Sequence, residues 1–188
     1  KKTGQVELLN AQDQLFCNAY CTFLTILTKK SMQKKTEPIL KLYHIGESHC
    51  LSYAHNVVKV QKKSYSIVPS ITLGAKAFHF STKENNEYKS ITKYKLDHIP
   101  KQSNVFLSFG EIDCREEEGL LSASKKMGIS TKSLVKKTIS GYITWFLKNN
   151  TSNKHQFYFF NVPAPIYNGK QPPDKNHAVA NLIKFYNI

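Results

Sequence analysis

Four short apolar runs, each followed by Gly or Pro and polar residues, constrain the fold more than any other feature of the chain. They cover residues 39–45, 64–72, 104–109 and 156–162. The polar segment 75–98 and the segment 116–149 between them are predicted to be helical, and 50–59 a short helix or loop. Ser130 after Gly128 is expected to start a second helix within 116–149. Nearly continuous apolar strands that alternate with helices predict an α/β fold with a parallel sheet covered on both faces.

The N-terminal part of the chain has a different pattern. Residues 7–30 carry apolar side chains at helical spacing, and the polar stretch 31–37 leads to Pro38. We therefore divide the chain into an N-terminal helix and linker, residues 1–37, and an α/β domain, residues 38–188. Because the chain begins with Lys1, we expect it to be part of a longer protein.

The strand ends carry the chemistry. Gly46–Ser48, Gly74, Gly110–Arg115 and Asn161–Pro165 each follow a predicted strand. Since the carboxyl ends of parallel strands meet at one edge of a sheet, these segments are expected to form one site there. Ser48 is the candidate nucleophile, because Gly46 permits a tight turn that exposes its hydroxyl. An ordinary helix-capping turn is the alternative interpretation of the same residues.

Composition excludes some functions. The apolar stretch 15–27 is too short to span a membrane, and a cytoplasmic location is expected. The net charge is +14, but Arg115 is the one arginine among 27 basic residues, which argues against a nucleic-acid partner. The four cysteines do not have the spacing of a metal site, and free thiols are expected.

The motifs at the strand ends resemble those of a known enzyme superfamily. Gly46-Glu47-Ser48-His49, Gly74, the run Ser108 to Arg115 and Val162–Pro165 are similar to the SGNH (GDSL-like) hydrolases. The resemblance is closest to a branch with Gly-Glu-Ser-His and Phe-Gly-Glu-Ile-Asp-Cys-Arg motifs. It implies a three-layer α/β/α flavodoxin-like parallel sheet and a serine esterase or acyl-transfer mechanism. It implies no metal and no organic cofactor.

The resemblance also implies residue roles. Ser48 would be the nucleophile, and the N–H of Gly74 would help to hold the oxyanion. Ile112 stands where the superfamily usually has an Asn, so one side-chain donor is missing. Substrate contacts would come from the remaining matched positions, which are His49, Gly110, Glu111, Asp113 and Arg115. For the last three, an internal ion-pair network that holds the loop is the alternative.

The general base is the least defined part of the predicted site. The superfamily supplies it from an Asp-x-x-His after a fifth strand, and Asp174 and His177 are the one match in this chain. We expect either that His177 is the base or that the true motif and the fifth strand lie beyond residue 188.

The resulting expectation is an enzyme that hydrolyses or transfers an acyl ester of a small molecule or glycan. The alternative is a catalytically degenerate domain that binds a glycan or a protein partner in the same pocket.

Overall fold

The structure is a computed structural model, and it describes residues 14, 18, 21, 22, 39–60, 62–162 and 181–184. The chain divides into two compact units, Lys1–Pro38 and Ile39–Ile188. In the first unit the four described residues are helical and fall within the predicted helix 7–30. The second unit contains every strand of the described chain, and the remainder of the fold description concerns this unit.

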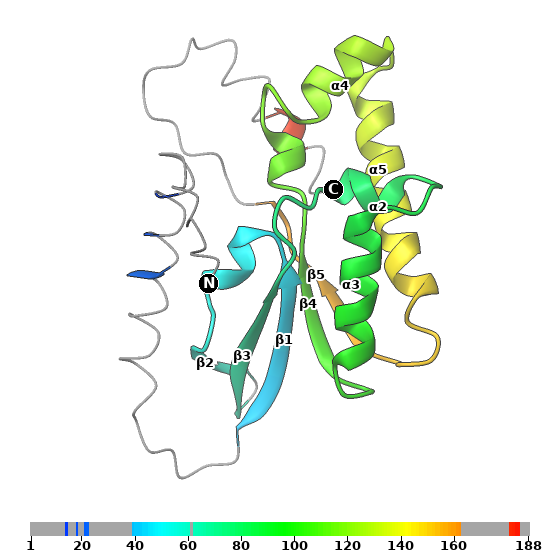
Figure 1. Cartoon of the computed structure of the whole chain (residues 1–188). Coiled ribbons are helices and arrows are strands. Elements are labelled where there is room, and N and C mark those ends of the chain that lie inside the picture. The colour runs from blue at the N-terminus through cyan, green and yellow to red at the C-terminus, as the bar shows by residue number, and fades with distance from the viewer. Residues whose placement is uncertain are drawn as a thin grey trace, which may run out of the picture. The chain divides into compact units, whose positions relative to one another are not determined.

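The centre of the second unit is a five-stranded sheet with the strand order β2-β3-β1-β4-β5 (Figure 1). The strands are β1 (Leu40–Gly46), β2 (Val57–Val60), β3 (Lys63–Ile71), β4 (Asn104–Ser108) and β5 (Gln156–Phe159). Strand β1 pairs in parallel with both β3 and β4, and β4 pairs in parallel with β5. The predicted α/β class is therefore confirmed, and four strands form the parallel sheet that the apolar runs predict.

The edge strand β2 corrects the prediction of a purely parallel sheet. Residues 57–59 lie in the segment 50–59 that was interpreted as a short helix or loop, yet they belong to β2 and pair antiparallel with β3. The two strands are separated by Gln61 and Lys62, and Lys62 has a left-handed φ of 69°. Hairpin turns of this kind usually contain Asn or Gly, so the sequence lacks the usual signal.

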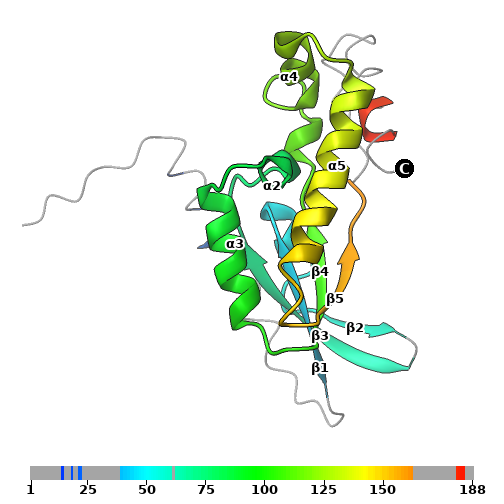
Figure 2. The same ribbon diagram turned by 90° about the vertical axis from the view of Figure 1, so that its right-hand side faces the viewer.

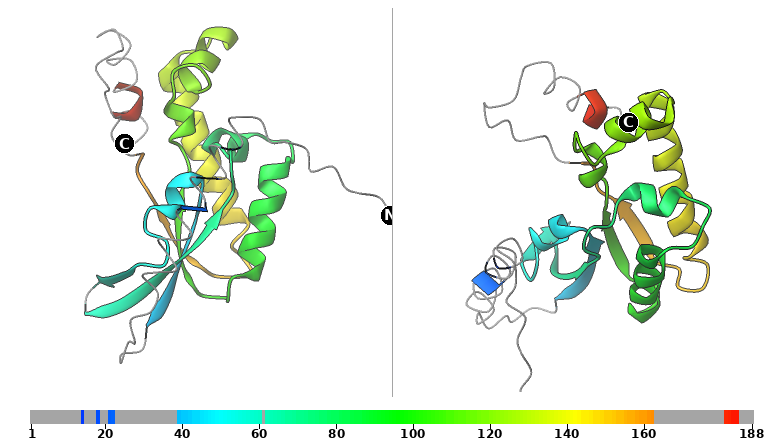
Figure 3. Two further views of the ribbon diagram at one scale, coloured as in Figure 1. Left: turned by 60° about the vertical axis from the view of Figure 1, so that its left-hand side comes forward. Right: turned by 45° about the horizontal axis from the view of Figure 1, so that its top comes forward.

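The helices are α2 (Ala77–Ser81), α3 (Glu87–His98), α4 (Leu120–Met127) and α5 (Thr131–Lys148), with the short 3-10 turns η1 (Ser48–Leu51) and η2 (Ile112–Cys114). Figures 1 and 2 show α2, α3 and α5 on one face of the sheet. The turn η1 lies on the other side, at the carboxyl end of β1, as both views of Figure 3 show. Among the described residues no long helix covers that second face, so the predicted third layer is not seen there.

Local sequence explains where the helices begin and end. The side chain of Asn86 accepts a hydrogen bond from the Lys89 N–H at the start of α3. Ser130 does the same for the Ser133 N–H at the start of α5, as predicted. Gly128 ends α4 with a left-handed φ of 63°, which costs glycine little. These caps fix the helix lengths on the covered face.

The main core lies between the sheet and these helices. Ile45, Val105 and Leu107 are fully buried and pack with rings from the helices, including Phe80 and Phe146. Because side chains alternate along a strand, the residues between them point to the opposite face. Rings from several elements hold the helices against the carboxyl half of the sheet, namely Phe80, Phe109, Tyr142, Phe146 and Phe159.

Candidate functional site

The carboxyl end of β1 is held tightly between its two neighbours. The Thr72 N–H donates to the Gly46 carbonyl at 2.7 Å, and the Glu47 N–H donates to the Ser108 carbonyl at 3.2 Å. A Cβ on Gly46 would collide with the side chain and the backbone of Ser108. Glycine is therefore required here for the strands to approach, and the chain turns immediately after it.

Ser48 is the first residue of η1 and is exposed. Its N–H, like that of Gly74, donates no hydrogen bond to any described residue. Gly74 sits in the turn after β3 with a left-handed φ of 71°. Among the described side chains, no imidazole hydrogen-bonds the Ser48 hydroxyl. The sheet edge thus presents one hydroxyl and two N–H groups without partners in the described part of the chain.

A pocket of about 170 Å³ opens at the same edge. It lies between β1 and β4. After β1 the chain continues to β2 and β3 on one side of β1, and after β3 it crosses to β4 on the other side. Ligands of open α/β sheets bind at this type of crevice. The pocket is lined by His44, Glu47, His49, Ser52, Tyr53, Ser108, Phe109, Glu111, Phe160, Asn161 and Val162.

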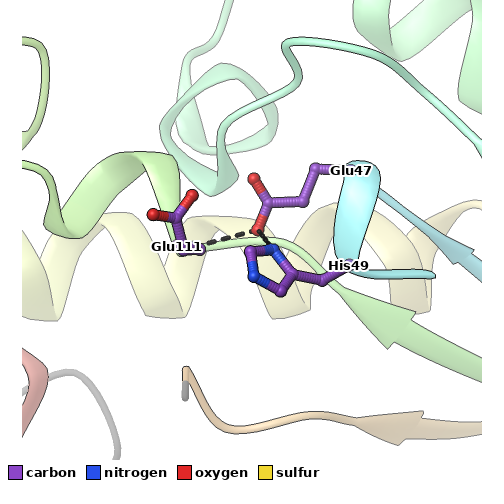
Figure 4. Close-up of side chains that lie close together, drawn as sticks. All are labelled: Glu47, His49 and Glu111. Carbon is purple, nitrogen blue, oxygen red and sulfur yellow. Dashed lines mark hydrogen bonds and ion pairs between the residues drawn. The ribbon is translucent and has the colours of Figure 1, made fainter. Parts of the chain in front are cut away.

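Glu47 is the most unusual group in the pocket. Its side chain is only 3% exposed. Oε1 accepts the Glu111 N–H at 3.1 Å, and Nδ1 of His49 is 3.5 Å from the same oxygen (Figure 4). Oε2 is buried with no described hydrogen-bond partner. Burial, followed by the charge of Glu111, raises the pKa of Glu47 to about 8.

His44 is the second buried polar group of the pocket. Its Nε2 lies 2.9 Å from the Ser108 hydroxyl, and its ring stacks on Phe160 with a centroid distance of 5.3 Å. Burial lowers the pKa of His44 to about 4, so the ring is neutral at pH 7. Sequence reasoning missed this residue. The available signal was its position two residues before Gly46, which puts it on one face of the strand near the sheet edge.

The contacts of Asp113 stabilise the fold, because its carboxylate binds backbone groups. It is fully buried, and its two oxygens accept the N–H groups of Ala77 at 2.7 Å and Phe78 at 3.0 Å. Burial raises the pKa of Asp113 to about 6, while the two N–H donors act in the opposite direction. This carboxylate therefore caps the first turn of α2 and joins it to η2.

Arg115 forms the ion-pair network that the sequence left as an alternative. Its guanidinium contacts Glu111 at 2.9 Å and Glu118 at 2.9 Å. These hydrogen bonds raise the pKa of Arg115 above its already high value. Gly110 precedes the network, is buried, and has a positive φ of 134°. The loop after β4 is thus braced by its own side chains.

The predicted site residues fall into three groups. His49 and Glu111 line the pocket, together with Glu47, which carried no predicted role. Five others lie at the sheet edge or its loops but do not line it, and these are Ser48, Gly74, Gly110, Asp113 and Arg115. Asp174 and His177 lie outside the described residues. Besides His44, the lining residues Tyr53 and Phe160 were not predicted, because single aromatic residues after a strand or turn carry no distinctive signal.

Comparisons with protein-family models, with curated proteins and with solved structures find no match for this chain. Among the described residues, no helix is both long enough and apolar enough to cross a membrane.

Proposed function

We propose that the chain is an SGNH-like serine esterase or acyltransferase, with Ser48 as the nucleophile. One observation carries the proposal: an exposed serine is the first residue of the turn after the central strand, beside a pocket at the switch point of the sheet. The motif resemblance described above supplies the reaction class. The observed geometry supports a ligand site at this edge.

In the proposed reaction, Ser48 Oγ attacks the acyl carbon and its proton passes to an imidazole. The bond from the acyl carbon to the leaving oxygen breaks, and the imidazole returns the proton to that oxygen. Water or an acceptor hydroxyl then releases the acyl group from Ser48. The N–H groups of Ser48 and Gly74 are the proposed donors to the oxyanion, which is consistent with their lack of described partners.

Two imidazoles are candidates for the base. His177, paired with Asp174, follows from the resemblance. His49 is adjacent to Ser48, and its Nδ1 lies 3.5 Å from Oε1 of Glu47. The variants His49→Ala and His177→Ala separate these assignments, because the rate of acylation should fall strongly in the variant that lacks the base and much less in the other.

An acyl ester on a carbohydrate is the proposed substrate. The pocket combines exposed aromatic surface from Tyr53 and Phe160 with polar groups at Ser52 and His49. Such a mixture suits a sugar, which has both apolar C–H faces and hydroxyls. We place the reaction in the cytoplasm, a prediction that is consistent with the free thiols of Cys50 and Cys114.

A second candidate function is ligand binding without catalysis. It is favoured by the fact that Ser48 does not line the described pocket, and by Ile112, which is buried and offers no side-chain donor. In that case a glycan or a protein segment would occupy the pocket and would not be cleaved.

The test is hydrolysis of short acyl esters of p-nitrophenol and of acetylated sugars by the purified protein. Ser48→Ala is compared with Ser133→Ala, a matched control because Ser133 is an exposed serine that does not line the pocket. The proposal expects Ser48→Ala to lose at least 100-fold in kcat/KM and Ser133→Ala less than 5-fold, on the order expected for a nucleophile. Equal activity of Ser48→Ala and the unmodified protein would refute it. Binding of an acetylated sugar without turnover would favour the second candidate.

A further inference from the structure

Three potential metal ligands converge from two segments of the chain. Glu47 and His49 follow the end of β1, and Glu111 follows β4. One oxygen or nitrogen atom from each lies within 4.8 Å of the other two. All three residues also line the pocket. Figure 4 shows the Glu47 carboxyl group beside the His49 ring, with Glu111 opposite.

The separation between Glu47 and His49 suits two ligands of one ion. Oε1 and Nδ1 are 3.5 Å apart and do not form a hydrogen bond. Two ligands about 2.1 Å from a tetrahedrally coordinated ion are about 3.4 Å apart. The observed spacing therefore leaves room for a metal ion between the two atoms without a large movement of either side chain.

Burial gives an independent reason to expect a cation. The Glu47 side chain is only 3% exposed, and its Oε2 has no hydrogen-bond partner among the described residues. The His49 Nδ1 is also buried and without a hydrogen bond. Buried polar atoms in folded proteins normally have partners, because the loss of water is otherwise uncompensated. An ion bound to Glu47 Oε1 and His49 Nδ1 would give the imidazole nitrogen a partner and would balance the charge of the buried carboxylate.

Charge also favours a divalent ion. Arg115 lies between Glu111 and Glu118, so this group of three carries one net negative charge when ionised. An ionised Glu47 adds a second. A divalent cation balances both, and Glu111 can keep Arg115 on one side because a carboxylate has about four acceptor positions.

We propose that Glu47, His49 and Glu111 bind a divalent transition-metal ion, Zn²⁺ or Mn²⁺, in the wall of the pocket. One imidazole nitrogen and two carboxylates are a ligand set that both ions accept. Three protein ligands leave at least one coordination position for water or a ligand oxygen. This site goes beyond the proposed serine reaction and differs from the resemblance, which implies no metal. It does not require Ser48.

The test is calorimetric titration of the chelator-treated, untagged protein with Zn²⁺ and, separately, with Mn²⁺. We expect one saturable site for at least one ion. His49→Ala and Glu47→Gln should each weaken its affinity at least tenfold, whereas His98→Ala should not. His98 is a matched control because it is an exposed histidine at the end of α3. His49→Ala should leave the fold intact, since the His49 side chain is 41% exposed.

The thermal midpoint without metal checks folding, and metal should raise it in the unmodified protein but not in His49→Ala. Absence of saturable binding for both ions, or equal affinity in folded His49→Ala, would overturn the site. Ser48→Ala should bind the ion as the unmodified protein does. If Ser48→Ala loses esterase activity but still binds the ion, the serine mechanism and the metal site are independent. If Ser48→Ala loses metal binding, the proposed metal site is contradicted.

Discussion

Replacing Asp113 with Ala should destabilise the second unit rather than abolish catalysis directly. Asp113 is fully buried, and its carboxylate accepts the N–H groups of Ala77 and Phe78. The substitution removes both acceptors and leaves two backbone donors without partners at the start of α2. The contact between α2 and the loop after β4 is lost with them.

The size of the effect follows from these contacts. A buried donor left unsatisfied costs about 1–3 kcal/mol, and loss of a helix cap about 1 kcal/mol. Part of this is offset because the carboxylate no longer has to be buried, which is the cause of its raised pKa. We expect a net loss of about 3 kcal/mol. In a unit of this size that lowers the thermal midpoint by roughly 6–12 °C.

Urea denaturation followed by circular dichroism measures the loss. Glu117→Ala is the matched control, because Glu117 is an exposed acid in the same loop and should change stability by less than about 0.5 kcal/mol. If the free energy of unfolding of Asp113→Ala is within about 0.5 kcal/mol of that of the unmodified protein and the variant still loses activity, the capping role is wrong and the carboxylate acts on the substrate.

Two further predictions concern the strand that leads to the site. Burial lowers the pKa of His44 from 6.5 to about 4, so between these values the unfolded chain binds a proton that the folded chain does not. Stability should therefore fall by up to about 3 kcal/mol as the pH drops from 6.5 to 4, with a smaller slope in His44→Asn. Equal slopes in urea denaturation series would contradict this. Gly46→Ala should cost at least about 3 kcal/mol because its Cβ meets Ser108, whereas Gly128→Ala has open space and should cost about 1 kcal/mol for its left-handed φ. Similar losses in the two variants, measured by thermal denaturation, would refute the packing argument.

Much of the fold was predictable because buried central strands leave a simple pattern in the sequence. Residues 39–45 and 104–109 are mostly apolar, and they became the central strands β1 and β4. The helix boundary at Ser130 was predictable from its capping chemistry. The hairpin strand β2 was not, since its turn depends on Lys62 at a positive φ.

The candidate site was predictable in position but not in detail. Gly46, Gly74 and Gly110 marked the sheet edge, because Gly46 ends β1 and the other two follow closely after β3 and β4. The sequence could not predict that Glu47 is buried while Ser48 is exposed. The direction of each side chain depends on the backbone conformation where β1 ends and η1 begins. Nor could it distinguish the capping role of Asp113 from a substrate contact, since both require a buried carboxylate near a loop.

Covalent labelling by a fluorophosphonate tests the role of Ser48 most directly. Intact-mass analysis of the protein should show one adduct per chain, and peptide mapping should place it on Ser48. The adduct should be absent from Ser48→Ala and retained in Ser52→Ala. No adduct on the unmodified protein, or an equal adduct on Ser48→Ala, would contradict the assignment of Ser48 as a nucleophile.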